Sequence, residues 1–565
     1  MKPDVPMDRI ILPKRDCPRY KMHKYWAAKP WYVISEYINH YTKEGEIVFD
    51  PFCGSGVVGC EALINRRKAV LNDLNPVAVF ISQNLCRSPI NLEKLQDAFE
   101  KIKMNVKDEI MGMYKIGGSC EVCGGTLYAK HIIRGPASKG KWIVEARCEK
   151  KHGRECRVRR YLSEEEKAHI EQLERLKPAH WYPEDELPDG REIMRLKSAG
   201  ITRVNELFTK RNLIALSILF NEIQKISDSA IKELMLLAFS NTILHVSKLK
   251  SEDLRPMSAN SYYCMEDWIE ENVWMRFENR FYWHWGVYEG KKETNLLIGD
   301  YYKPTGEFSE LKGDKTFMLM NRPAQKMSKI PDSSMDYCFT DPPYGGSIQY
   351  SELTFLWRCW LNMKNDFVHD EIVVNDFQNK KEEHFEYMLR LAFGEVYRVL
   401  KPGRWLSVTF NNRNPKIWLA LLNACEGAGF TWVNAIPQKP VCKSFVQSWT
   451  GNSLKRDLVI NFRKPTSDKS YYFKAPDGQC VDDDVDIDDI IISSSINCML
   501  RKKEVLLSEL YEEAVIRWMS QAKTIRKRCA FDMKAVDACL KESEQFFRRE
   551  APDGIFYSFA HDPKE

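Results

Sequence analysis

The 565-residue chain has no apolar run long enough to cross a bilayer, which takes about 20 predominantly apolar residues. It also has no strong excess of charge. The net charge of +5 is small, so any contact with nucleic acid must come from local patches. The N-terminal stretch Met1–Pro6 has no apolar core of a signal peptide. We therefore expect a cytoplasmic protein with no membrane partner.

A disulfide framework is also absent, because the 17 cysteines are spread thinly over a long chain without a secretory signal. This distribution favours free thiols or metal sites over disulfides. The hydrophobic content of 44% allows large cores, and the length predicts two to four domains.

The most informative segment is 340–345, with the sequence Thr-Asp-Pro-Pro-Tyr-Gly. It follows an apolar run, 335–339, that is typical of a buried strand. An exocyclic amino group of a nucleobase is a poor nucleophile, because its lone pair is delocalised into the ring. Asp341 can accept one amino hydrogen and the carbonyl of Pro342 the other, and the fixed φ of proline holds that carbonyl rigidly. Tyr344 offers a ring for base stacking, so the segment predicts methylation of a base amino group, although such a turn alone is more often an ordinary loop.

A glycine-bearing turn lies far upstream, at residues 50–56, with the sequence Asp-Pro-Phe-Cys-Gly-Ser-Gly. It joins an expected strand ending at Phe49 to an expected helix from Val57. Glycines at such a turn let the backbone approach a ligand, and the helix N-terminus adds N–H donors. A second expected strand ends just before Asp73, where a doubly wound fold places the acid that binds ribose hydroxyls. An ordinary tight turn is the alternative for the glycine pattern alone.

Together these motifs resemble the S-adenosylmethionine-dependent amino methyltransferases of DNA, which make N6-methyladenine or N4-methylcytosine. Residues 23–30, from His23 to Lys29-Pro30, resemble a further cofactor motif of that family, near the methionine end of the cofactor. The resemblance covers about residues 20–85 and 315–465. It implies a catalytic set of Asp341, Pro342, Pro343 and Tyr344. The implied cofactor-binding set is Lys29, Pro30, Asp50, Pro51, Phe52, Gly54, Ser55, Gly56, Asp73 and Asn75.

The expected fold is α/β, a doubly wound, Rossmann-like methyltransferase sheet interrupted by a large insertion. Helix breaks and glycines divide the second half into alternating strands and helices up to Phe462. The expected parts are a cofactor-binding first half (1–100), a zinc-ribbon insertion (101–165), a helical and aromatic target-recognition insertion (166–314), a catalytic second half (315–465), and an acidic linker with a helical C-terminal extension (466–565).

The zinc expectation starts from Cys120 and Cys123, a C-x2-C pair followed by two glycines. Two thiolates on a tight turn, completed by ligands across a hairpin, describe a zinc ribbon. Cys148, His152 and Cys156 offer three candidates for the two remaining places. The favoured set is Cys120, Cys123, Cys148 and Cys156, with His152 as the substitute. Four protein ligands leave no open position, so the role would be structural; free reduced cysteines are the alternative.

Two further features of the insertion could contact DNA. Residues 150–160 form the densest basic patch, suited to phosphate contacts or to an ordinary solvated surface. Residues 262–285 contain a cluster of aromatic residues, with Arg276 and Arg280 between them. We expect most of these aromatic side chains to belong to the core. Outside the insertion, candidates for clamping the base are Phe355, Trp357 and Trp449.

The function expected from these features is transfer of a methyl group from S-adenosylmethionine to N6 of a flipped-out adenine in duplex DNA. An aspartate at the first position of the catalytic turn favours adenine in the resembled family. The alternatives are an N4-cytosine DNA methyltransferase, an RNA guanine-N2 methyltransferase, and a catalytically dead DNA-binding subunit. The expected partners are double-stranded DNA and a restriction endonuclease or another defence-system subunit.

Overall fold

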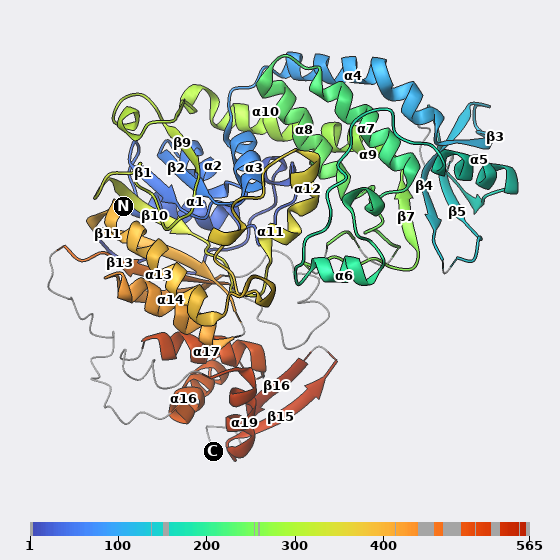
Figure 1. Ribbon diagram of the computed structural model, residues 1–565. Coiled ribbons are helices and arrows are strands. Elements are labelled where there is room, and N and C mark those ends of the chain that lie inside the picture. Colours follow the sequence, from blue (N-terminus) through green and yellow to red (C-terminus); the bar gives the residue numbers. More distant parts are fainter. Residues whose placement is uncertain are drawn as a thin grey trace.

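The computed structural model describes residues 4–136, 138–150, 157–252, 255–257, 260–412, 414–438, 457–466, 487–502, 504–520, 531–552 and 554–560. An eight-stranded sheet forms the centre of the protein (Figure 1). Its strand order is β12 (Thr431–Gln438), β13 (Asp457–Arg463), β11 (Leu400–Phe410), β10 (Met335–Thr340), β1 (Ile47–Asp50), β2 (Lys68–Asp73), β9 (Phe317–Asn321) and β8 (Pro304–Thr305).

The sheet is parallel except for β13, which runs antiparallel to both β11 and β12. Every residue of β10 is buried, as expected for a central parallel strand covered on both faces. The chain crosses from β1 to β2 and β9 on one side, and from β10 to β11 on the other. The direction of winding therefore reverses between β1 and β10, which is where open α/β sheets bind ligands.

Helices cover both faces of this sheet. One group consists of α1 (Trp31–Tyr41), α2 (Val57–Ile64) and α3 (Pro76–Cys86), and the other of α13 (Glu382–Val399) and α14 (Pro415–Gly427). Right-handed crossovers put helices wound in opposite directions on opposite faces. Asn75 caps α3 by accepting a hydrogen bond from the backbone N–H of Val77 at 3.0 Å, and Pro76 occupies the first helical position. The doubly wound part of the expected fold is confirmed.

The insertion extends from the core as helices followed by a small antiparallel sheet (Figure 1). Its first helix, α4 (Leu92–Gly112), runs through the expected boundary at residue 100. The sheet contains β3 (Lys115–Ser119), β4 (Thr126–Arg134), β5 (Ile143–Cys148), β6 (Arg157–Tyr161) and β7 (Trp268–Glu271). The helices are α5 (Glu164–Glu174), α6 (Ile193–Ser198), α7 (Lys210–Gln224), α8 (Ser229–Ile243), α9 (Val273–Tyr282) and α10 (Val287–Leu297).

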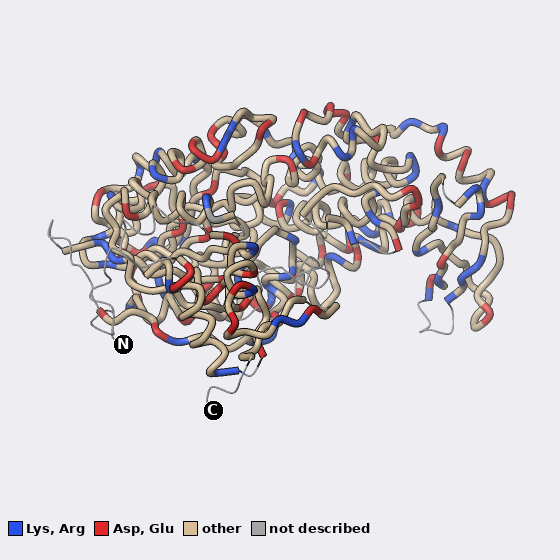
Figure 2. The backbone as a smooth tube through the Cα atoms, turned by 90° about the horizontal axis from the view of Figure 1, so that it is seen from below, with Lys and Arg blue, Asp and Glu red and all other residues tan. Residues whose placement is uncertain are grey.

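The aromatic cluster of the insertion is core only in part: Tyr262, Trp274, Phe277 and Phe281 are buried, and Trp268, Tyr282 and Trp285 are half-buried. Tyr263 and Trp283 are exposed. Two arginines of the basic patch are already in ion pairs, Arg159 with Glu252 and Arg160 with Glu166. Basic and acidic residues are intermingled over the rest of the molecule (Figure 2).

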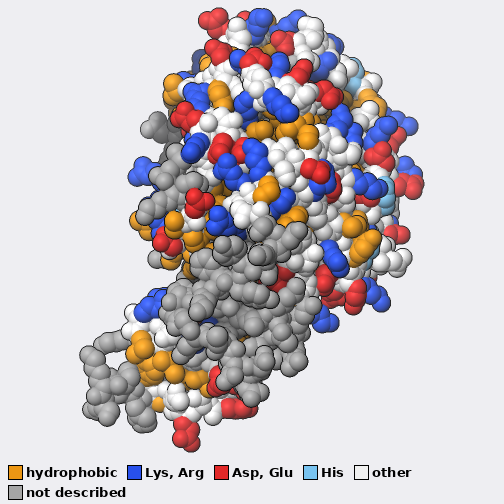
Figure 3. Space-filling view, turned by 90° about the vertical axis from the view of Figure 1, so that its left-hand side faces the viewer, with side chains coloured by type: hydrophobic (Ala, Val, Ile, Leu, Met, Phe, Trp, Pro, Cys, Tyr) orange, Lys and Arg blue, Asp and Glu red, His pale blue; other side chains and the backbone are white. Residues whose placement is uncertain are grey.

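The C-terminal region is not wholly helical, and this part of the expectation was wrong. It contains α16 (Ile487–Met499), α17 (Leu507–Ser520) and α19 (Met533–Glu542), but also a sheet of order β14 (Val505–Leu506), β16 (Gly554–Phe559) and β15 (Phe546–Ala551). Pro552-Asp553-Gly554 lies between two aromatic-rich runs, which is the composition of a β-hairpin. The module projects below the main body (Figure 3). The acidic run expected to be a linker lies mostly outside the described residues.

Every cysteine in the described part of the chain is a free thiol, in line with the expected absence of disulfides. Among the same residues, each helix is too short or too polar to span a bilayer.

Candidate active site

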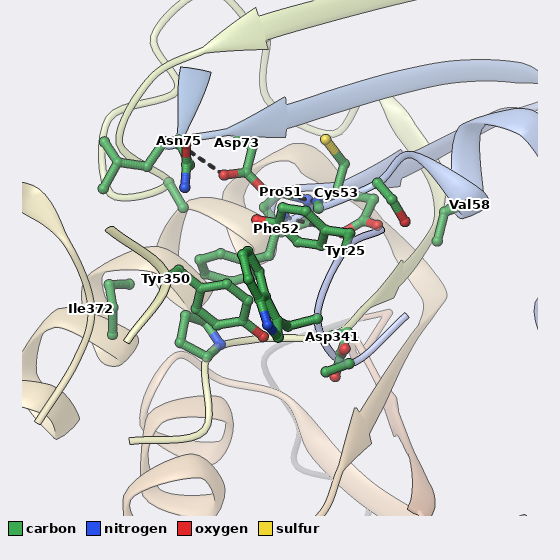
Figure 4. A pocket seen from close by; sticks show the side chains of 18 of the residues that line it. Tyr25, Pro51, Phe52, Cys53, Val58, Asp73, Asn75, Asp341, Tyr350 and Ile372 are labelled. Carbon is green, nitrogen blue, oxygen red and sulfur yellow. Dashed lines mark hydrogen bonds between the residues drawn. The ribbon is translucent and has the colours of Figure 1, made fainter. Parts of the chain in front are cut away.

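The expected functional residues come together at the carboxyl ends of β1, β2 and β10. Asp50 ends β1, Asp73 ends β2, and Asp341 directly follows β10. All three line one pocket with about 960 Å³ of empty space, part of it open to solvent. Figure 4 shows Asp73 and Asn75 on one side of this pocket and Asp341 on another. The winding reversal between β1 and β10 places the pocket there.

The glycine turn is held in a shape that only glycine adopts easily. Gly56 caps the N-terminus of α2 with φ of +82°, in the left-handed region. A Cβ at Gly56 would lie 2.8 Å from the side chain of Ser82 and 2.9 Å from its Cα, so the helix backbone packs directly against the turn. The hydroxyl of Ser82 also donates to the carbonyl oxygen of Gly54 at 2.8 Å. Gly56 is not among the residues that line the pocket; it fixes the conformation of the turn whose other residues do.

Asp73 is fixed by backbone donors from two segments. One carboxylate oxygen accepts the N–H of Gly54 and the other the N–H of Asn75, both at 2.8 Å. Burial raises the pKa of Asp73 to about 6, and these hydrogen bonds oppose the rise. Each oxygen keeps a lone pair for a further donor, so Asp73 can accept from a pair of ligand hydroxyls.

Asp50 lines the pocket and is also hydrogen-bonded within the protein. One of its oxygens accepts from the backbone N–H of Phe52 at 3.1 Å and from the hydroxyl of Thr340 at 2.7 Å. Burial raises its pKa to about 8, because the surroundings disfavour the charged form. Asp50 lines the pocket, but its carboxyl group also joins the glycine turn to the end of β10.

Asp341 stands where the pocket meets a second, larger cleft. Its carboxylate accepts hydrogen bonds from the hydroxyls of Tyr344 and Thr409, the latter at 3.0 Å. Tyr344 lines the larger cleft, while Asp341 and Pro343 line the pocket. Gly345 has φ of +59°, and a Cβ there would lie 2.8 Å from Ile417, which fixes the end of the turn. The turn thus connects two cavities.

Lys29 faces the catalytic turn and lines both cavities. Its Nζ lies 2.9 Å from Asp457, 3.6 Å from Asp341 and 4.9 Å from the ring centre of Tyr344. Burial raises the pKa of Asp341 to about 6, and the charge of Lys29 opposes this rise. Burial lowers the pKa of Lys29, but the two carboxylates more than offset it, so its pKa is raised. Asp341 is therefore mostly ionised at neutral pH.

Most of the remaining expected cofactor-binding residues also lie at the pocket. Pro51, Phe52, Gly54, Ser55 and Asn75 line it, whereas Pro30 lines the larger cleft and is the N-cap of α1. Pro342 lines neither cavity with its side chain.

Several site residues were not found from the sequence. Tyr25 and Tyr350 lie nearly parallel at the pocket, with ring centres 5.9 Å apart and an angle of 20°. Asp457 at the start of β13 accepts from Asn411 at 3.1 Å and pairs with Lys29. Polar residues at the carboxyl end of β11, such as Asn411, were a signal that could have been used, because neighbouring parallel strands end at the same edge.

The expected clamps on the base are not supported by their positions. Trp357, in α12 (Phe355–Trp360), is fully buried and packs against His23 and Trp26, with ring centres 4.7 Å and 5.0 Å away. Phe355 is also buried. Trp449 lies outside the described residues.

Three of the four expected zinc ligands lie together. The Sγ atoms of Cys120, Cys123 and Cys148 all lie within 4.8 Å of one another, and those of Cys123 and Cys148 are 3.5 Å apart. Tetrahedral zinc–thiolate bonds of about 2.3 Å put sulfur atoms at about 3.8 Å, close to this spacing. Cys156 and His152 lie outside the described residues.

Comparisons with known proteins found similarity to DNA methylases. A family profile described as DNA methylase, of the N6/N4 type, matches residues 11–84. The type II methyltransferase M.MvaI of Kocuria varians is 25% identical over 183 residues, which is 31% of this chain and 36% of that relative. The chain thus spans about a third of the length of the curated relative it matches.

Two solved structures show weaker likeness. One is a candidate DNA modification methylase from Thermus thermophilus, solved with S-adenosyl-L-methionine. It is 17% identical, the match covers 27% of this chain and 57% of that one, and the TM-score is 0.17. The other is a possible exported protein from Bordetella parapertussis, with 12% identity, coverage of 48% and 92%, and a TM-score of 0.16.

The fold and the pocket define an α/β protein with acids at the carboxyl ends of its central strands. The profile that matches residues 11–84 and the relative that is 25% identical over 183 residues support a place for this chain in the amino DNA methyltransferase family.

Proposed function

We propose that the protein transfers a methyl group from S-adenosylmethionine to the N6 amino group of an adenine in duplex DNA. The observation that carries this proposal is the position of Asp341. Its carboxylate lines the same pocket as Asp73 and Gly54, and is hydrogen-bonded to Tyr344 of the adjoining cleft. A group placed there can act on a base in the cleft next to a cofactor in the pocket.

The residues of the pocket fit S-adenosylmethionine. Tyr25, Phe52 and Tyr350 provide aromatic surface for a purine, and both oxygens of Asp73 can accept from ribose hydroxyls. When bound, the cofactor would supply the methyl group.

The catalytic turn would act by orienting the target amino group. Asp341 is mostly ionised at neutral pH, so its free lone pairs can accept one amino hydrogen, and the backbone carbonyl of Pro342 can accept the other. These hydrogen bonds localise the nitrogen lone pair and aim it at the pocket. Most of the acceleration would come from holding the reacting atoms at about 3–3.5 Å. The base must leave the stack to reach this position.

Adenine is proposed over cytosine because an aspartate begins the catalytic turn, as in the adenine enzymes of the resembled family. N4-cytosine methylation would use the same geometry. The proposal includes a role in restriction-modification or another defence system, with a nuclease or other subunit as partner, in the cytoplasm. This part rests on the resemblance alone.

We also propose that the insertion carries a structural zinc ion and recognises the target sequence. The converging thiols of Cys120, Cys123 and Cys148 support the zinc site. Cys156 is the favoured fourth ligand, and His152 the alternative. The placement of the insertion beside the larger cleft supports the recognition role, because His245 and Arg280 line that cleft.

Asp341→Ala tests the catalytic role. We expect methyl transfer to fall at least about 100-fold, while cofactor affinity stays within about twofold, since the acceptor acts on the base. The matched control is Asp370→Ala, another carboxylate at the pocket, which makes no contact with the turn. It should change the rate less than about threefold. Full activity of Asp341→Ala would refute the proposed mechanism.

A further inference from the structure

Arg280 of the insertion is a cation without an acidic partner. Among the described residues, no carboxylate lies within ion-pair distance of its guanidinium, and the buried Nε has no hydrogen-bond partner. One terminal nitrogen lies 2.6 Å from Nε2 of His245, which must accept this hydrogen bond. Burial and the neighbouring cations, Arg280 first among them, lower the pKa of His245 well below its usual value, so this imidazole is neutral.

The surroundings of Arg280 hold more positive charge than acid. Lys250 and Arg276 share one carboxylate, that of Glu271. Lys24 also lacks an acid among the described residues; its Nζ donates to the carbonyls of Pro256 and Met257 at 3.0 Å and 2.9 Å. The third N–H of this ammonium has no hydrogen-bond acceptor among the described residues. Burial lowers the pKa of Lys24 to about 8 and that of Arg280 to about 10, the latter with help from Arg276.

Three fully buried arginines of this protein show how a guanidinium charge is neutralised within it. Arg19 lies 2.9 Å from Glu61 and 2.6 Å from Glu293. Arg134 and Arg211 share Glu270, at 2.7 Å and 2.9 Å. A half-buried charge without a counter-ion lowers stability, and an anion bound from outside would offset this cost. Arg280 and Lys24 therefore indicate an anion site.

This site opens into the cleft that holds the catalytic turn. Lys24, His245, Arg255 and Arg280 line the cleft, as does Tyr344. None of these four residues lines the pocket proposed for the cofactor. An anion bound by Arg280 and Lys24 would thus share a cavity with the target base, separate from the pocket that contains Asp73.

We propose that Arg280 and Lys24 bind a backbone phosphate of the DNA strand that carries the target base, with His245 orienting the guanidinium. A guanidinium and an ammonium match the negative oxygens of a phosphodiester. The phosphate would position the strand, so that a flipped base enters the cleft towards Asp341 and Tyr344. That this phosphate belongs to DNA rests on the proposed function.

The test is equilibrium binding of a fluorescent duplex DNA to the full chain at several salt concentrations. Arg280→Met removes the charge and keeps most of the apolar stem. We expect its affinity to fall about tenfold, and the slope of log K against log [salt] to become shallower by about one. The matched control is Lys94→Met, an exposed lysine of α4 that does not line the cleft. It should leave the slope unchanged.

Two more measurements separate this proposal from its rivals. Affinity for S-adenosylhomocysteine should stay unchanged in Arg280→Met; if it falls while DNA binding does not, the site holds the carboxylate of the cofactor and the proposal is overturned. The thermal midpoint of free Arg280→Met should equal or exceed that of the wild type, since a cation lacking a counter-ion is removed. A lower midpoint with an unaltered salt slope would show a purely structural role.

The binding experiment does not depend on methyl transfer, so it remains informative if the proposed reaction is wrong. Suppose that the salt slope of Arg280→Met shows the loss of one phosphate contact although the wild-type protein methylates no DNA. That result would support the phosphate site and refute only the proposed reaction. An unchanged slope in an active enzyme would refute only the phosphate site.

Discussion

The α/β core and the insertion compensate their charged groups in different ways. In the core, Asp73 is held by two backbone N–H groups, and Lys29 lies between the carboxylates of Asp341 and Asp457. In the insertion, the thiols of Cys120, Cys123 and Cys148 converge. Arg280 forms no ion pair with a carboxylate among the described residues, although Glu271 is near enough to act on its pKa. The charges at the catalytic turn are thus compensated within the core, whereas Arg280 and the thiol cluster of the insertion can each accept a partner from outside.

This difference separates chemistry from recognition. A pocket whose polar groups are already fixed needs no reorganisation during the reaction, which is the usual source of electrostatic catalysis. Groups without partners gain most from a ligand, so they suit a surface that binds DNA and a lobe that depends on a metal. The predictions below test each side of the comparison.

The largest effect should follow from disturbing the fixed turn of the core. Gly56→Ala places a Cβ 2.8–2.9 Å from Ser82 and forces a non-glycine residue into a left-handed conformation. We expect cofactor affinity, measured by calorimetry, to fall at least about tenfold, since the strain of about 1–2 kcal/mol adds to the clash. Gly45→Ala is the control, because Gly45 has φ of +79° with no atom within 4 Å of the added Cβ.

Gly45→Ala should lower stability by a similar backbone strain and leave cofactor affinity unchanged. Equal losses of affinity in the two variants would show that general destabilisation, and not the turn beside Ser82, is responsible.

A smaller, local effect should follow from loss of the metal. Protein purified without chelators should contain about one zinc per chain by elemental mass spectrometry, and Cys123→Ser should lose it. Hydrogen exchange should then speed up in β3–β6, which the metal would stabilise, and stay slow in β10. Cys264→Ser, at a half-buried cysteine outside the cluster, is the control.

Comparing Cys156→Ser with His152→Ala identifies the fourth ligand, and we expect the cysteine variant to lose zinc. If the wild-type protein contains no zinc and its β3–β6 lobe is still protected from hydrogen exchange, the metal site is contradicted.

The smallest effect concerns the pH dependence of the reaction. Asp341 must be ionised to accept an amino hydrogen, so kcat/KM should decline as pH falls through about 6, its pKa in the free protein. Lys29 lowers this pKa and Asp457 raises it. Lys29→Met should therefore move the acid limb to higher pH, and Asp457→Asn should move it to lower pH. Shifts in the same direction in both variants would contradict the assigned network.

The sequence predicted the core of the site because its residues stand at strand ends. Asp50, Asp73 and Asp341 each follow an apolar run, and parallel strands bring their carboxyl ends to one edge. The pairing of Lys29 with Asp457 could not be predicted in this way, because the two residues are 428 positions apart and no local pattern connects them.

Other features depend on packing that the sequence does not specify. A large aromatic residue suits both a core and a base-binding surface, and Trp357 proved to be core because His23 and Trp26 surround it. That no carboxylate of the described residues forms an ion pair with Arg280 is likewise visible only in three dimensions. The C-terminal hairpin, by contrast, had a readable signal in Pro552 and Gly554 between its two aromatic runs.

The most direct test of the account is mass spectrometry of nucleosides after incubation of the protein with methyl-labelled S-adenosylmethionine and unmethylated duplex DNA. Parallel incubations with tRNA and with Asp341→Ala serve as controls. The account predicts labelled N6-methyladenine from DNA only, and none from the variant; N4-methylcytosine would keep the mechanism and change the base. Labelled guanine from tRNA, or no labelled nucleoside although the cofactor binds, would contradict it.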